Sequence, residues 1–205
     1  MKWVRRILYA AVVIMAVMVG ARYWGMHAAM ERIAAPTLGQ FIGPADAKQV
    51  IVEFMDYRCY ACRITSAAID EFHESHPDVK IVFRQVPVMG DISTNEARIA
   101  LAAGLNGKFI EMHNLLIKRE KPVEDAEIDG LAHEVGIDPA KLRTDMMDMA
   151  VTREIMVALA AADALKLGGT PGFYINGTLF TSTMKIATAD DLYRVLMHGP
   201  QEKAP

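Results

Sequence analysis

The sequence predicts an α/β fold, because short apolar strands stand at both ends of a block that is almost wholly helical. Gln49–Met55 and Val79–Val86 are β-rich apolar runs, and a helical pattern lies between them, which makes a β-α-β unit. Two more short strands, Pro171–Asn176 and Thr178–Phe180, meet at Asn176-Gly177, a strong hairpin signal.

The segment from about Ser93 to Leu167 has the apolar spacing of helices nearly throughout. The longest predicted helix covers Met147–Leu167, and Gly168-Gly169 would end it. A final helix is predicted over Thr188–His198. The expected order is therefore β-α-β, a helical block, and then α-β-β-α.

The N-terminus is typical of a membrane or export signal. Basic residues precede Ile7–Ala21, an uncharged apolar run of a length between that of a signal-peptide core and that of a full span. We expect an uncleaved signal anchor over residues 1–26, followed by a linker over residues 27–41. A cleaved signal peptide is the alternative. In both cases the basic residues stay inside and the rest of the chain crosses the membrane.

The charge distribution argues against nucleic acid as a partner. The chain has a net charge of −3, but residues 1–35 carry +4, so the remainder carries −7. Binding to phosphates requires a basic face, and the sequence shows no basic stripe with interleaved aromatic residues.

The chain has two cysteines, Cys59 and Cys62, at the point where the first strand passes into a helix. Unpaired N–H groups and the positive end of the dipole at a helix N-terminus stabilise a thiolate, so the pKa of Cys59 should lie below ~8.5. Cys62 is one turn further on, within reach of a disulfide. We expect Cys59 to be the exposed nucleophile and Cys62 the shielded resolving thiol. Arg58 and Arg63 should favour the thiolate further.

A Cys-x-x-Cys pair also occurs in metal sites. This chain has no second such pair and no His-x-x-x-His, so we expect no metal and no cofactor other than the redox-active pair itself. Two alternatives stay open. One is a copper carrier that uses the cysteines and methionines, and the other is a redox-inert binding module.

Two further positions are candidates for the site. Glu53 lies inside an apolar strand, where burial of an acid is costly unless the acid is used, and it could relay a proton for Cys62. A solvent-facing glutamate is the alternative. Thr170-Pro171 precedes a strand, and general frequencies by themselves predict an ordinary trans proline there.

Two segments carry a family resemblance. Val50–Arg63 (VIVEFMDYRCYACR) and Gly169–Gly177 (GTPGFYING) resemble the DsbA-like branch of the thioredoxin superfamily, and the exported BdbD-like proteins in particular. The resemblance covers about residues 42–200. It implies a thioredoxin-like fold with a helical domain inserted at about residues 92–150, which leaves a tail over residues 201–205.

The resemblance also implies roles for particular residues. The residue that matches Pro171 is cis in the family and faces the disulfide, and the one that matches Thr170 offers backbone hydrogen bonds to substrate. Glu53 matches the buried acid. Tyr60-Ala61, which would also contact substrate, departs from the usual dipeptide of proline followed by histidine or tyrosine. That departure should alter thiolate stability and redox potential.

The expected function is oxidation of exported protein thiols through Cys59 and Cys62, on the periplasmic side of the bacterial inner membrane. The resemblance implies a DsbB-type membrane oxidase as partner. An isomerase or reductase served by a DsbD-type reductase is the alternative. The N-terminal segment would anchor the protein, whereas its cleavage would leave the protein soluble in the periplasm.

Overall fold

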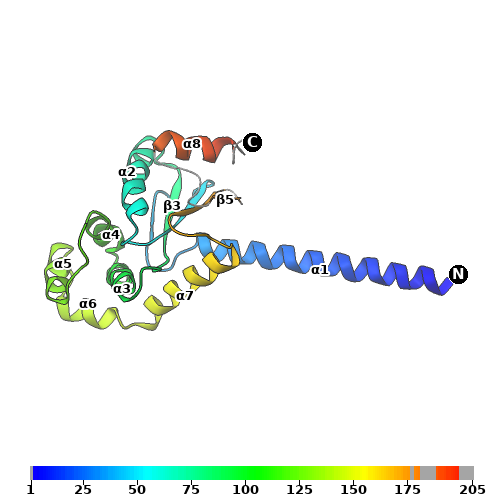
Figure 1. Ribbon diagram of the computed structural model, residues 1–205, viewed down its shortest axis with the longest axis horizontal. Coiled ribbons are helices and arrows are strands. Elements are labelled where there is room, and N and C mark those ends of the chain that lie inside the picture. The colour runs from blue at the N-terminus through cyan, green and yellow to red at the C-terminus, as the bar shows by residue number, and fades with distance from the viewer. Residues whose placement is uncertain (1, 176–177, 181–187, 199–205) are drawn as a thin grey trace.

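A five-stranded mixed sheet lies at the centre of the fold (Figure 1). The computed structural model describes residues 2–175, 178–180 and 188–198. The strand order is β1-β3-β2-β4-β5, in which β2 and β3 are parallel and the other neighbours are antiparallel. The strands are β1 (Phe41–Ile42), β2 (Val50–Met55), β3 (Lys80–Gln85), β4 (Gly172–Ile175) and β5 (Thr178–Phe180).

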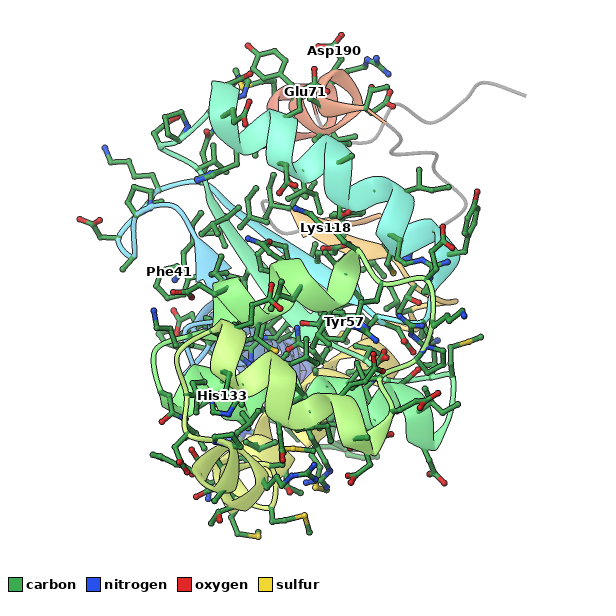
Figure 2. The ribbon with its side chains drawn as sticks, turned by 90° about the vertical axis from the view of Figure 1, so that its left-hand side faces the viewer. Phe41, Tyr57, Glu71, Lys118, His133 and Asp190 are labelled. Carbon is green, nitrogen blue, oxygen red and sulfur yellow. The ribbon has the colours of Figure 1, made fainter. Side chains whose placement is uncertain are left out.

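Helices connect the strands in the predicted order. Helix α2 (Tyr60–Ser75) joins β2 to β3, and α8 (Ala189–His198) follows the hairpin. Figure 2 views the molecule from the side of the inserted helices, with α2 and α8 above them. The insertion between β3 and β4 consists of α3 (Asp91–Leu105), α4 (Phe109–Ile117), the short 3-10 helix η1 (Asp125–Glu127), α5 (Ile128–Glu134), α6 (Pro139–Asp145) and α7 (Met149–Ala164).

Strand β2 is buried on both faces because its side chains alternate between two layers. Ile51 and Met55 pack with residues of α2, α3, α4 and α8, whereas Val52 and Phe54 pack with α7 and the end of the first helix. Glu53 stands between Ile51 and Met55 in this alternation. It therefore lies on the face that α2 covers.

Regular elements extend into both ends of residues 27–41, the range expected to be a linker. Helix α1 (Lys2–Ala34) continues without interruption through the first part of that range, and projects away from the body so that only its C-terminal end lies against it (Figure 1). Phe41 already belongs to β1, which pairs with β3. A strand of two residues is too short for alternation to reveal it in the sequence. Among the residues described, no membrane-spanning helix is identified.

Helix α7 ends earlier than Gly168-Gly169, at Ala164. Lys166 adopts a left-handed backbone with φ 54°, and the N–H of Leu167 donates to the carbonyl of Ala162 at 2.8 Å. This is the hydrogen bond of a Schellman motif. Such a motif usually has glycine at the left-handed position, so a lysine there gives no sequence signal.

The predicted hairpin is confirmed by the antiparallel pairing of β4 with β5. Its turn, Asn176-Gly177, lies outside the described residues, as does the tail over residues 201–205.

A buried polar network joins α7, β3 and the chain that leaves α1. Arg84 on β3 forms an ion pair with Glu154 on α7, and its Nε donates to the carbonyl of Ile33 at 2.8 Å. The Glu154 carboxylate also accepts from Gln40 Nε2 at 3.1 Å and from the Thr37 hydroxyl. The Arg84 side chain is 1% exposed, so its charge depends on these partners.

Candidate active site

Cys59 and Cys62 lie at the N-terminus of α2. Cys59 is the N-cap residue, with φ −73° and ψ 117°, so its backbone is extended while its carbonyl already accepts from the N–H of Arg63. Cys59 is half-buried, whereas Cys62 is fully buried. Both are free thiols. The arrangement leaves Cys59 open to attack and shields Cys62, as the sequence predicts.

The pKa of Cys59 is lowered from 9.0 to about 5. The largest cause is a hydrogen bond from the Cys62 thiol, and the Thr170 side chain and the backbone N–H groups of Cys62 and Ala61 add to it against the opposing effect of burial. In contrast, the pKa of Cys62 is raised, because its proton is shared with the Cys59 sulfur, because it is buried and because Glu53 is near. The pair is thus one acidic thiol and one that retains its proton.

The two arginines beside the pair do not act on the thiol as expected. Arg58 Nη2 and Arg63 Nη1 both donate to the carbonyl of Arg119, at 2.9 and 3.0 Å, and Arg58 Nε pairs with Glu96 at 2.8 Å. Neither arginine is among the causes of the low pKa of Cys59. They hold the loop after α4 against the active-site helix.

The Thr170–Pro171 peptide bond is cis, so the family resemblance rather than the general frequency predicts it correctly. Pro171 is buried. The carbonyl oxygen of Thr170 accepts from the Cys59 thiol at 3.2 Å. The segment before β4 therefore lies directly beside the nucleophile, although more than a hundred residues separate the two in the chain.

Tyr60 and Ala61 are exposed in the first turn of α2, and Tyr60 is 69% exposed. The Arg63 guanidinium lies over the Tyr60 ring at 5.8 Å from its centroid. An aromatic face next to the accessible thiol can contact a polypeptide bound there.

Glu53 is buried, with 2% exposure, which excludes the solvent-facing alternative. Burial and then the charge of Cys59 raise its pKa to about 8. The carboxyl group is therefore mostly protonated at neutral pH and can give a proton to a sulfur that leaves as a thiolate.

A Glu53→Gln variant is expected to exchange disulfides about 10²-fold more slowly at neutral pH, because an amide cannot donate that proton. In the unaltered protein the rate should also fall as pH rises through about 8, when Glu53 ionises. Stopped-flow measurement of the exchange rate as a function of pH checks both predictions. The substrate is an aromatic thiol that is fully ionised over the whole pH range of the experiment. If the exchange rate of the Glu53→Gln variant still fell above about pH 8, the assignment of Glu53 as the proton donor would be contradicted.

A Thr170→Val variant is expected to raise the pKa of Cys59 by about one pH unit, because it removes a hydrogen bond to the thiolate. The ultraviolet absorbance of the thiolate, followed in a pH titration, measures this. Thr170→Ser keeps the hydroxyl and is the matched control, with a pKa that should stay near 5. Equal pKa values in both variants would show that the hydroxyl has no effect.

Asp56 organises the site and was missed in the sequence. Its carboxylate is buried and accepts from the N–H of Arg58 at 2.7 Å, from the Ser93 hydroxyl at 2.8 Å and from the N–H of Val88 at 2.8 Å. It thereby ties the turn that carries Cys59 to the turn between β3 and α3. An aspartate directly after a buried strand, where side-chain to backbone turns form, was the available signal.

A second missed group lies beneath the site. The Tyr57 hydroxyl and His113 Nδ1 are 3.0 Å apart, and both residues are buried. Burial lowers the pKa of His113 to about 3, so this histidine is neutral and serves as core. Among the residues that the structure describes, no group of three or more histidine, cysteine and acidic residues could hold a metal ion.

Sequence comparison identifies the family and several relatives of this chain. Residues 50–194 match the family described as DSBA-like thioredoxin domain. The chain is 29% identical over 137 residues to Na(+)/H(+) antiporter NhaA 1 of Salinispora arenicola, covering 66% of this chain and 21% of that protein. It is 28% identical over 167 residues to Na(+)/H(+) antiporter NhaA of Herminiimonas arsenicoxydans, covering 78% and 26%. The chain thus spans about a fifth to a quarter of the length of these relatives.

Solved structures show the same fold. A thioredoxin-like oxidoreductase from Silicibacter pomeroyi is 30% identical, with a TM-score of 0.70 over 76% of this chain and 88% of that one. The thiol-disulfide exchange protein α-DsbA2 from Wolbachia pipientis is 23% identical (TM-score 0.69; 76% and 84% covered), and BdbD from Bacillus subtilis is 21% identical (0.66; 80% and 94%). The family match covers both cysteines and the cis proline, so this chain belongs to the DsbA-like thioredoxin family.

Proposed function

We propose that the protein introduces disulfides into exported proteins through Cys59 and Cys62. The observation that carries the proposal is the difference between the two thiols, because the pKa of Cys59 is about 5 while that of Cys62 is raised. A thiolate that is stabilised in the reduced form makes the disulfide form a stronger oxidant.

The exchange begins with the oxidised Cys59–Cys62 pair. A substrate thiolate attacks Cys59 Sγ, the bond between the two cysteine sulfurs breaks, and Cys62 leaves as a thiolate that takes a proton from Glu53. A second substrate thiolate then attacks the substrate sulfur of the mixed disulfide, and Cys59 leaves as a thiolate. The substrate gains a disulfide and the protein keeps two electrons.

The partner and the location are part of the same proposal. A DsbB-type membrane oxidase would accept the two electrons and restore the disulfide. The apolar residues of α1 are exposed along the part that projects from the body, which supports attachment to the inner membrane with the active site in the periplasm. Fractionation of cells, with and without a salt or carbonate wash, tests this attachment, and release of the protein by the wash would contradict it.

Equilibration of the pair with glutathione tests the direction of exchange. A potential near −120 mV would support an oxidase, and one near −270 mV a reductant. The alternative, an isomerase or reductase that receives electrons from a DsbD-type protein, is favoured by the Tyr60-Ala61 dipeptide, which lacks the usual proline and histidine. Reactivation of scrambled ribonuclease would separate isomerase from simple reductase.

A further inference from the structure

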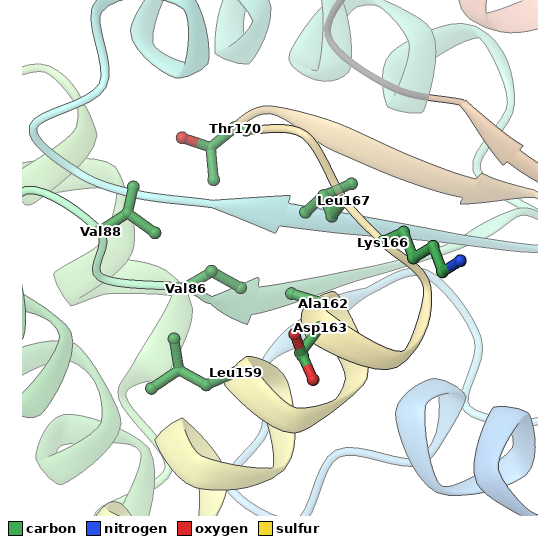
Figure 3. A pocket seen from close by; sticks show the side chains of 9 residues that line it. Val86, Val88, Leu159, Ala162, Asp163, Lys166, Leu167 and Thr170 are labelled. Carbon is green, nitrogen blue, oxygen red and sulfur yellow. The ribbon is translucent and has the colours of Figure 1, made fainter.

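A pocket of about 450 Å3 lies beside Thr170, between the C-terminal half of α7 and the turn from β3 to α3. We refer to it as the α7 pocket. Figure 3 shows Thr170 above it, Leu159 below, Val88 to the left and Lys166 to the right. Its volume is within the range of ligand pockets, about 300–1,000 Å3.

The α7 pocket and the active site share one residue, Thr170. This residue lines the pocket, and its carbonyl oxygen is 3.2 Å from Cys59 Sγ. Successive residues of a polypeptide are about 3.8 Å apart. When a substrate polypeptide is bonded to Cys59 through its own cysteine, the residues next to that cysteine are therefore within reach of the α7 pocket.

Five of the nine residues that line the α7 pocket are aliphatic, and two, Asp163 and Lys166, are charged. Val86 is buried, Val88 and Leu159 are 54% and 37% exposed, and Leu167 is half-buried. Single exposed apolar residues are common on protein surfaces. Here they line one hollow beside a reactive thiol, which is the position for a side chain of the exchanging partner.

Hydrogen bonds link the wall of the α7 pocket to the turn that carries the nucleophile. One Asp56 oxygen accepts from the N–H of Arg58, next to Cys59, and the other accepts from the N–H of Val88 at 2.8 Å in the pocket wall. One buried carboxylate thus connects both. A preformed arrangement reduces the loss of freedom on binding.

The backbone of Lys166 is a second reason to regard the α7 pocket as a functional site. It has φ 54°, a conformation that favours glycine, and its side chain lines the pocket. It forms no ion pair with any residue in the described ranges, and its ammonium is directed away from the other labelled side chains in Figure 3. Non-glycine residues with a strained backbone are found disproportionately at functional sites.

We propose that the α7 pocket is a specificity subsite, which takes one large apolar side chain of the substrate polypeptide close to the cysteine that is exchanged. The methylene chain of Lys166 extends the apolar wall, as the stems of lysines commonly do. The inference rests on the proposed function, because it concerns the polypeptide that exchanges with Cys59.

The test uses full-length Cys62→Ser protein whose Cys59 carries a thionitrobenzoate mixed disulfide. A peptide thiolate attacks Cys59 Sγ, a peptide–Cys59 disulfide forms, and thionitrobenzoate leaves as a coloured thiolate. The peptides have one cysteine in a glycine–serine background, and a single leucine is moved through the three positions on each side. Leucine at one position should raise the rate at least about tenfold over serine.

Leu159→Ser should abolish this gain and leave the rate of the all-serine peptide unchanged. Met149→Ser is the matched control, because Met149 is 70% exposed on the same helix and about 15 Å from Leu159 along its axis. The control should retain the gain. Lys166→Gly should fold at least as stably and lose part of the gain.

Two results would overturn the subsite. One is equal rates for leucine and serine at every position, and the other is a gain that survives in Leu159→Ser. Failure of every peptide to release thionitrobenzoate is a different result, because it would overturn the proposed exchange itself.

Discussion

Substitution of Cys59 by serine is expected to lower thiol–disulfide exchange by on the order of 10³-fold or more, because it removes the nucleophile on which every step depends. Cys59 is the accessible thiol of the pair, and its pKa of about 5 keeps it ionised at neutral pH. Oxidation of reduced ribonuclease and reduction of insulin measure the loss in the two directions.

The matched variant is Cys62→Ser, which keeps the nucleophile but removes the thiol that resolves the intermediate. It should accumulate a mixed disulfide with a substrate polypeptide, visible as a band that a reductant removes on gel electrophoresis. Because Cys62 is fully buried, the Cys59→Ser variant should form no mixed disulfide. A mixed disulfide at Cys62 in that variant would contradict the roles assigned to the two thiols.

Glu154→Ala is expected to lower the free energy of unfolding by about 3–5 kcal/mol, the range for breaking one side of a buried ion pair. The Arg84 side chain is 1% exposed and would be left charged without its carboxylate partner. Chemical denaturation, monitored by circular dichroism, measures the change.

Two comparisons make that stability prediction specific. Asp125→Ala removes an exposed partner of Arg143, since the Asp125 side chain is 84% exposed, and should cost less than about 1 kcal/mol. An Arg84→Met, Glu154→Leu double variant removes both charges and should recover much of the loss. A Glu154→Ala protein as stable as the Asp125→Ala one would show that the network contributes little.

The order of elements and the nucleophile could be predicted from sequence because both depend on local patterns. Apolar runs mark β2 and β3, and the position of Cys59 at the start of α2 follows from the change of period after Met55. The sequence also predicted that the pKa of Cys59 is lower than that of a free thiol. Its largest cause is a contact within one helical turn, with Cys62.

Other features could not be predicted because their partners are distant in the chain. Arg58 was expected to act on the adjacent thiol, but its guanidinium binds Glu96 and the carbonyl of Arg119. No local pattern shows that these groups, which are distant in the chain, lie within hydrogen-bonding distance of Arg58. The contact of His113 with Tyr57 was missed for the same reason.

The fold class, the cysteine pair and the family resemblance all follow from patterns among neighbouring residues, so the amino-acid sequence is sufficient to predict them. The contact between the Thr170 carbonyl and Cys59, the pKa of about 8 for Glu53 and the pocket beside the nucleophile could be established only from the folded protein. Burial and electrostatic environment depend on elements that pack together from separate parts of the chain, and these contacts exist only in the folded protein.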